Sequence, residues 1–264
     1  MEPHKLLAML RKQEGRGQLE TARRTRAFAS RVFRYAVATA RAKADPAALL
    51  LGAVAAPRPR NLAAIIEPKE VGTLLRAIEA YGGQPATRFA LALSPHVLVR
   101  PGELRQAEWT EFDFDAAVWR IPAARMKKRR EHVVPLSRQS LAILMAAREL
   151  TGEGRLVFPA MGKRDRPMSE NTVNLALRRM GFDQGVMTAH GFRAMASPLL
   201  NESGRWSPDA IERALAHKDG DQVRAAYHRG AHWKERVAMA QWWSDHLDTL
   251  RDGATVLPFQ AGGR

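Results

Sequence analysis

Cysteine is absent from the 264-residue sequence. That absence excludes disulfide bonds, zinc sites with thiolate ligands and a cysteine nucleophile. Long apolar runs are also missing, since none approaches the roughly 18 residues that a membrane-spanning helix requires. No charged, apolar and small-residue leader follows Met1, so secretion is not expected either. The sequence therefore predicts a cytoplasmic protein without a membrane partner.

Acidic and aromatic residues are scarce. Lysine and arginine number 42 against 27 aspartate and glutamate, the net charge is +15, and aromatic residues make up 7% of the chain. A surface this basic attracts polyanions and binds phosphate backbones by releasing counterions. Nucleic acid is therefore the expected partner, with a ribosomal-type or merely basic protein as the alternative. An RNA-binding role is disfavoured because no aromatic stacking platform is evident.

The excess of positive charge is greatest near the N-terminus, where residues 1–60 hold 13 Lys and Arg against 4 Asp and Glu. Residues 19–43 lack proline and glycine, and apolar residues recur there at roughly helical spacing. This pattern predicts a long basic helix that contacts the phosphates of DNA. The arginines expected to make those contacts are Arg23, Arg24, Arg26, Arg31 and Arg34.

A proline-punctuated stretch follows the predicted basic helix. Asp45-Pro46 ends the helical pattern, and residues 55–61 read Ala-Ala-Pro-Arg-Pro-Arg-Asn, a stiff composition typical of linkers. We therefore expect a helical segment over residues 1–54, a linker over 55–66, a larger domain over 67–250 and a tail over 251–264.

The periodicity of the larger domain changes from helical to alternating and back. Helices are expected first, over residues 68–81 and 84–94. Short strands rich in β-forming residues follow over 108–114, 117–122 and 131–135. Helical patterns then return over 137–150, 169–180, 190–201, 207–216, 221–227 and 231–250. The predicted fold class is α+β, mainly α with one small antiparallel β-sheet.

Residue types suited to phosphoryl transfer occur in order along this domain. Each one alone is more typical of a surface residue, a helix cap, a salt-bridge partner or a half-buried packing residue. Together they provide cations for a phosphate, groups for proton transfer and a phenolic nucleophile. In chain order the set is Arg100, the turn Met126–Arg130 with Lys127 and Lys128, His190 with Arg193, and His217 ten residues before Tyr227.

This ordered set resembles the tyrosine recombinase (phage integrase) family, and especially the integrases of prophages and genomic islands. The resemblance runs from about Glu14 to Leu250. It implies a tyrosine-recombinase catalytic domain preceded by part of a helical core-binding domain. The similar stretches are Arg100-Pro-Gly-Glu-Leu-Arg105, Val133-Val-Pro-Leu-Ser137, Pro167-Met-Ser-Glu-Asn171, Thr188-Ala-His-Gly-Phe-Arg193 and Val223-Arg-Ala-Ala-Tyr227.

The activity that the resemblance implies is site-specific recombination of DNA, for integration or excision of a mobile element, with no cofactor or metal. Tyr227 would attack the scissile phosphate and form a 3′-phosphotyrosine intermediate. Arg100 and Arg193 would clamp the non-bridging oxygens and neutralise their charge. The other tyrosines, Tyr35 in the basic helix and Tyr81 at a helix end, are each explained by packing.

The resemblance also assigns roles to the remaining members of the set. His190 would accept or orient the proton of the nucleophile, and His217 would hydrogen-bond the phosphate. Lys127 would protonate the departing 5′-oxygen, with Lys128 as a rival because a one-residue change in register exchanges their directions. The rest of that basic turn is expected to contact DNA through Lys128, Arg129 and Arg130.

The final predicted helix carries more apolar surface than water tolerates, including Trp242, Trp243 and Leu247. It either docks on its own domain or, as the resemblance implies, inserts into a neighbouring copy. The partners implied are double-stranded DNA at attachment sites, three further copies in a homotetramer joined through this helix, and an accessory DNA-bending protein. The expected location is the nucleoid.

Two other functions are possible for this sequence. Integrases of this type carry an arm-site-binding domain and a complete core-binding domain, so the sequence is expected to begin partway through the latter. A truncated, non-catalytic DNA-binding remnant is therefore the alternative function. A type IB topoisomerase, which shares the chemistry, is a further candidate.

Overall fold

The computed structural model describes residues 1–56, 63–127, 129–216 and 232–253. The chain divides into two compact units, Met1–Asn61 and Leu62–Arg264. The predicted helix over residues 221–227 lies outside the described residues.

The first unit is a helical hairpin. Its helices α1 (Pro3–Gly15) and α2 (Leu19–Ala38) lie side by side, and a short 3-10 turn follows at Ala48–Leu50. Helix α2 ends before the predicted Lys43, because Ala40 adopts a left-handed conformation with φ 55° that turns the chain away. A small core holds the two helices together and contains Leu6, Leu10, Ala22, Ala47, Leu50 and Val54.

The second unit contains the predicted antiparallel sheet. Its strands are β1 (Phe112–Asp113), β2 (Val118–Ile121) and β3 (His132–Pro135), in the order β1-β2-β3. The register pairs Phe112 with Trp119, and these rings stack with their centroids 5.0 Å apart. Cross-strand aromatic pairs of this kind fix the register of a short sheet.

A second, two-stranded sheet was not expected. It consists of β4 (Pro159–Ala160) and β5 (Lys163–Pro167). Because β5 is almost entirely exposed and charged, it lacks the alternation of apolar and polar residues from which strands are predicted.

Helices make up most of the rest of the second unit. Several begin with proline directly after the capping residue, where the missing N–H costs no hydrogen bond. The described helices of this unit are α3 (Pro68–Glu79), α4 (Pro85–Val97), α5 (Pro101–Arg105), α6 (Arg138–Thr151), α7 (Thr172–Arg179), α8 (Gly191–Glu202), α9 (Pro208–Ala214) and α11 (Trp233–Arg251), with 3-10 turns at Trp109–Glu111 and Ala123–Arg125. The predicted fold class, mainly α with small antiparallel sheets, is confirmed.

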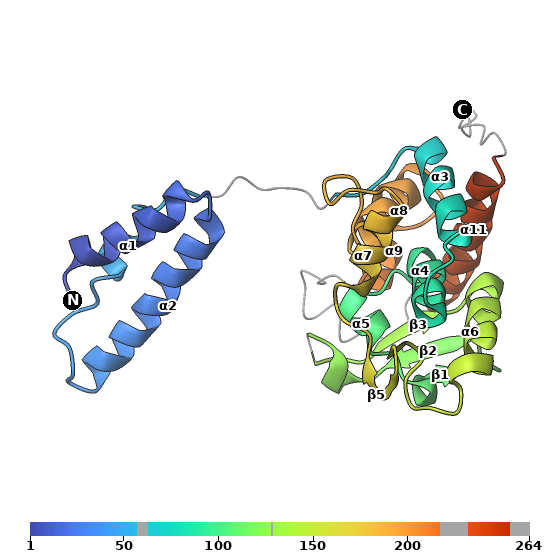
Figure 1. Cartoon of the computed structure of the whole chain (residues 1–264), viewed down its shortest axis with the longest axis horizontal. Coiled ribbons are helices and arrows are strands. Elements are labelled where there is room, and N and C mark those ends of the chain that lie inside the picture. The colour runs from blue at the N-terminus through green and yellow to red at the C-terminus, as the bar shows by residue number, and fades with distance from the viewer. Residues whose placement is uncertain (57–62, 128, 217–231, 254–264) are drawn as a thin grey trace. The chain divides into compact units, whose positions relative to one another are not determined.

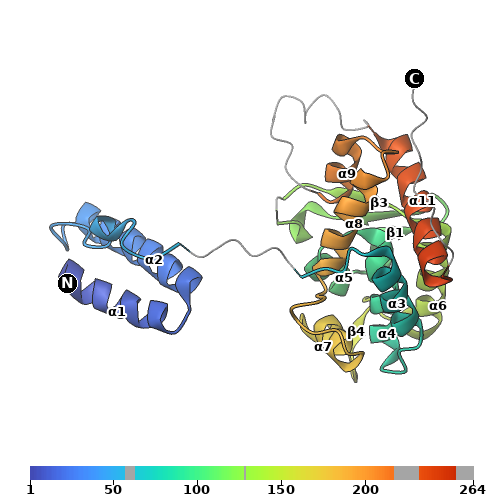
Figure 2. The same cartoon turned by 90° about the horizontal axis from the view of Figure 1, so that it is seen from above.

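Helix α11 packs on its own unit. It runs beside α3 (Figures 1 and 2), where the carbonyl oxygen of Leu250 lies only 2.2 Å from the position a Cβ would occupy on Gly72. Trp243 is buried and donates a hydrogen bond to the carbonyl of Pro95 at 2.8 Å. Of the two arrangements considered for this helix, the structure therefore shows docking on its own core. Among the described helices, none combines the length and apolar character needed to cross a bilayer.

Candidate active site

Arg100 is held in place by the helix that it caps. It stands immediately before α5, where its backbone N–H donates to Glu103 Oε2 at 2.8 Å and its Nη1 donates to Glu103 Oε1 at 2.9 Å. The Glu103 side chain is 5% exposed, whereas that of Arg100 is 23% exposed. A buried carboxylate thus fixes a guanidinium that reaches the surface.

Arg193 projects from the first turn of α8 into the protein and is 7% exposed. Its Nη1 donates to the carbonyl of Leu98, and its Nη2 donates to the carbonyl of Leu215 at 2.6 Å. Burial and the guanidinium of Arg100 lower the pKa of Arg193 to about 10, which leaves it protonated at neutral pH. A bound anion would offset both of these costs.

The end of α9 supplies carbonyls that orient both arginines. Arg193 binds the carbonyl of Leu215, and Arg100 Nη2 donates to the carbonyl of Ala216 at 3.1 Å. The last carbonyls of a helix lack partners within the helix and carry its partial negative charge. Ala216 adopts φ 48°, a left-handed conformation common just after a helix. One helix end therefore brings together two cations from distant parts of the sequence.

His190 lies one turn from Arg193, immediately before α8. The Thr188 hydroxyl accepts a hydrogen bond from the N–H of Gly191 at 3.0 Å. Gly191 is required because a Cβ there would lie 2.5 Å from the carbonyl oxygen of Ala63. The His190 ring is exposed, and partial loss of hydration followed by the charges of Arg193 and Arg100 lowers its pKa. The imidazole is therefore biased toward the neutral form that can accept a proton.

Lys127 lies in the exposed turn between β2 and β3. Arg125, just before it, anchors this hairpin by an ion pair with Glu111 at 2.9 Å and by donating to the carbonyl of Glu103 at 3.2 Å. Because Glu103 also holds Arg100, the hairpin and Arg100 share one support. No described contact joins the Lys127 ammonium to either arginine.

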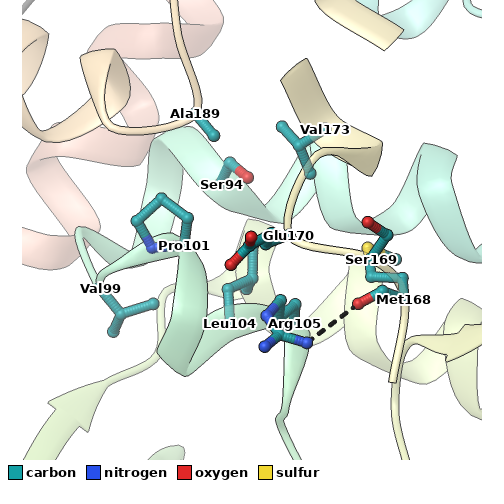
Figure 3. A pocket seen from close by; sticks show the side chains of 10 residues that line it. All are labelled: Ser94, Val99, Pro101, Leu104, Arg105, Met168, Ser169, Glu170, Val173 and Ala189. Atoms are coloured by element: carbon teal, nitrogen blue, oxygen red, sulfur yellow. Dashed lines mark hydrogen bonds between the residues drawn. The ribbon is translucent and has the colours of Figure 1, made fainter. Parts of the chain in front are cut away.

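A pocket is lined in part by Val99 and Pro101, the two residues that flank Arg100 in the chain (Figure 3). Arg105 lies within it and donates to the carbonyl of Met168 at 3.1 Å. This hollow was not predicted from the sequence. Its lining is Ser94, Val99, Pro101, Leu104, Arg105, Met168, Ser169, Glu170, Val173 and Ala189.

The structure gathers three of the six candidate catalytic residues, Arg100, His190 and Arg193, around one point. His217 and Tyr227 lie outside the described residues, as does the rival acid Lys128. Within the described part of the chain, no group of three or more His, Asp or Glu residues forms a metal site.

The remaining candidate DNA-contacting residues lie on exposed surfaces with one exception. Arg129 and Arg130 are exposed in the hairpin turn. Arg23, Arg24, Arg31 and Arg34 are exposed along α2. Arg26 is the exception, because it is partly buried and donates to the carbonyl of Ala47 at 3.2 Å.

Two residues of the site were not identified from the sequence. Glu103 follows Arg100 at the three-residue spacing of a capping interaction, which was a usable signal. His132 lies on β3 in phase with the buried Val134, so alternation along the strand places it inward. His132 could therefore have been identified as a titratable residue at a strand position that faces inward.

The chain belongs to the phage integrase family. The sequence model described as "Phage integrase family" matches residues 64–232, and that of the "Phage integrase central domain" matches residues 1–53.

Individual relatives are similar over nearly the whole chain. The integrase of Enterobacteria phage P4 is 42% identical over 261 residues, which cover 94% of this chain and 59% of that protein. Prophage integrase IntA of Escherichia coli strain K12 is 38% identical over 257 residues, covering 97% of this chain and 62% of IntA. The chain thus spans about three fifths of the length of these two relatives.

The fold is similar to that of lambda integrase, solved as a tetramer bound to a Holliday junction. The TM-score is 0.64 at 18% identity, and the match covers 84% of this chain and 66% of that chain. At this identity the likeness concerns the fold alone.

Proposed function

We propose that the protein is a tyrosine-type site-specific recombinase, which cleaves and rejoins DNA strands at attachment sites of a mobile element. The observation that carries the proposal is the arginine pair at the end of α9. Arg100 and Arg193 are oriented by neighbouring carbonyls and lie beside a histidine biased toward its neutral form. Two fixed guanidiniums match the non-bridging oxygens of a phosphodiester and neutralise the charge that grows on them during substitution.

The proposed cleavage step is a transfer of phosphorus between two oxygens. The phenolic oxygen of Tyr227 forms a bond to phosphorus while the bond to the 5′-oxygen of the leaving strand breaks, giving a 3′-phosphotyrosine. His190 accepts or orients the proton lost by Tyr227, and Lys127 supplies a proton to the leaving 5′-oxygen. His217 donates a hydrogen bond to the phosphate. Attack by a 5′-hydroxyl of another strand reverses the step and completes the exchange.

Double-stranded DNA is the proposed partner, and the nucleoid the proposed place of action. The exposed arginines of α2 and the basic turn after Lys127 would bind its backbone, because release of counterions favours such contacts. Four copies are proposed to act together, by extension from the lambda integrase tetramer on a Holliday junction. Their contact through α11 would use the part of the helix that its own unit leaves exposed, including Val237. An accessory DNA-bending protein is a further proposed partner.

The proposal is tested with a nicked duplex from the element's own attachment region. The short cleaved fragment diffuses away, so rejoining lacks its 5′-hydroxyl and the covalent adduct accumulates. Arg193→Lys keeps a positive charge but removes the planar fork, and it should slow adduct formation by roughly 10²- to 10³-fold. Affinity for the duplex should change little, because many other cations contact the backbone.

Arg76→Lys is the matched control. Arg76 also donates to a carbonyl, that of Arg251 at 2.8 Å, but it lies outside the arginine site. Its replacement should leave the rate of adduct formation unchanged. The reactions are run in excess EDTA, in which wild-type protein should still form the adduct. Equal rates for wild type and Arg193→Lys would contradict the proposed role of the arginine pair.

A further inference from the structure

His132 is a buried histidine to which the proposed mechanism assigns no task. It is the first residue of β3, pairs with Ile121 of β2 and is 8% exposed. The strand that it begins follows directly from the turn that contains Lys127. An imidazole is costly to bury unless hydrogen bonds compensate it, so its contacts indicate what it does.

The backbone of Ala214, at the end of α9, is the hydrogen-bond partner of His132. Its Nε2 is buried and has no partner among the described residues, so this contact is assigned to Nδ1, which donates to the Ala214 carbonyl. Three successive carbonyls therefore accept hydrogen bonds from three side chains around the phosphate site. In order, Ala214 binds His132, Leu215 binds Arg193 and Ala216 binds Arg100.

The surroundings of His132 keep its ring uncharged. Burial is the first cause, and the charges of Arg236, Arg193 and Arg100 add to it, lowering the pKa of His132 to about 3. Arg236 of α11 lies next to it and donates to the carbonyl of Val133 at 2.5 Å. A neutral ring with Nδ1 protonated offers one donor, and the Ala214 carbonyl uses it.

We propose that His132 is a positioning residue for the phosphate site, which fixes the turn 214–216 against β3 and thereby holds both arginine-binding carbonyls in register with the hairpin that contains Lys127. The inference rests on the proposed function for its catalytic consequence. The contact itself does not depend on the proposed function, because it joins strand β3 to the end of α9. Small displacements of such supports shift the guanidiniums away from the phosphate oxygens, and misplacement by about 1 Å can cost 100-fold in rate.

Three substitutions distinguish the donor at Nδ1 from the other properties of the ring. His132→Asn keeps an amide N–H near the position of Nδ1, His132→Gln places its amide near Nε2, and His132→Leu keeps the bulk without a donor. In the nicked-duplex assay, His132→Leu and His132→Gln should each slow adduct formation by about 10-fold or more, whereas His132→Asn should stay within about 3-fold of wild type. Duplex affinity should remain within about 2-fold for all three.

A second measurement does not depend on cleavage. Inorganic phosphate is titrated into protein labelled with ¹⁵N-arginine, and the Nε–H resonance that is missing from Arg193→Lys reports on Arg193. His132→Leu should weaken phosphate binding at that resonance by about 10-fold, and His132→Asn by about 2-fold or less.

The outcomes separate this inference from the proposed function. If wild-type protein forms no adduct while phosphate binding follows the expected order, the recombinase proposal fails and the positioning role stands. If wild type forms the adduct and His132→Leu behaves like wild type in both assays, the positioning role is wrong. Near-normal rates for His132→Gln together with a loss in His132→Asn would also overturn it, because Nε2 would then be the atom that matters.

Discussion

The two units of the chain differ in how they use charge and burial. In the first unit, α2 buries only Ala22 within the helix and leaves Phe28 and Tyr35 exposed among its arginines. In the second unit, Arg193 is buried and bound to carbonyls. Exposed cations lend affinity for polyanions that salt weakens, whereas buried, oriented cations act on one group at close range. Removing positive charge from the first unit should therefore reduce the affinity for DNA and its salt dependence, whereas removing it from the second unit should reduce the rate of cleavage.

The largest effect among these predictions concerns Lys127, whose ammonium lies in the exposed turn after β2. Lys127→Ala should slow cleavage of an ordinary phosphodiester by about 10²-fold or more, because the 5′-oxygen then departs without an acid. A substrate with sulfur in place of that bridging oxygen should be cleaved almost normally, since a thiolate needs no proton to leave. The measurement is the rate of adduct formation on both substrates.

Lys128→Ala is the control for the neighbouring ammonium and should affect neither substrate. Equal losses on the oxygen and sulfur substrates for Lys127→Ala would remove Lys127 from the acid role. A sulfur-rescued loss in Lys128→Ala instead would transfer that role to Lys128.

The next prediction concerns affinity and belongs to the first unit. Replacing the four exposed arginines of α2 by glutamine should reduce the slope of log affinity against log salt by up to about 3 to 4, since each phosphate contact contributes about 0.9. Arg26 is left in place because it supports the Ala47 carbonyl. The four replaced residues are Arg23, Arg24, Arg31 and Arg34.

A matched control uses the exposed basic residues of β5 in the second unit. They are Lys163, Arg164 and Arg166, and they are also changed to glutamine. The slope should change more for α2 than for β5. An unchanged slope for the α2 variant would contradict the assignment of backbone binding to the first unit.

The last of these predictions concerns stability and the half-buried His96 of the second unit. His96 contacts the Ser244 hydroxyl through Nδ1 at 2.9 Å, and burial lowers its pKa to about 4 from the ordinary 6.5. Between these two values the unfolded chain binds a proton that the folded chain does not, so stability is lost as the pH falls from 6.5 toward 4. The loss is of the order of 3 kcal/mol.

Urea unfolding at pH 7 and pH 4.5 measures this difference. His96→Leu should show a smaller fall in the free energy of unfolding between the two pH values than wild type. The exposed His4 of α1 provides the control, and His4→Leu should behave like wild type. An equal fall in His96→Leu and wild type would show that His96 does not titrate in this way.

The parts of the site that could be predicted from the sequence are the side chains that can be identified by their residue type and their order along the chain. Arg100, His190 and Arg193 were named from their motifs, and the structure gathers them. The carbonyls that orient the arginines could not be named, because backbone groups have no sequence signature and the end of α9 meets α5 and α8 only in the folded chain.

For the fold as well, features that depend on local sequence patterns could be predicted, and features that depend on contacts between distant residues could not. Most helices of the second unit and the three strands of its larger sheet were predicted from periodicity, whereas the short helix α5 and the first helix, α1, were not. Strand β5 was missed because its exposed residues, Lys163 to Arg166, carry no such pattern. His132 was missed for a related reason, since its partner on α9 lies more than 80 positions along the chain, at Ala214.

The location of the covalent bond tests the central claim most directly. Wild-type protein trapped on the nicked duplex is digested, and the peptide that carries the nucleotide is identified by mass spectrometry. The account predicts a phosphotyrosine at Tyr227, no adduct from Tyr227→Phe, and undiminished adduct from Tyr35→Phe and Tyr81→Phe, since that change removes only the phenolic oxygen. An adduct formed by Tyr227→Phe, or a phosphate on any other residue of the wild-type protein, would contradict it.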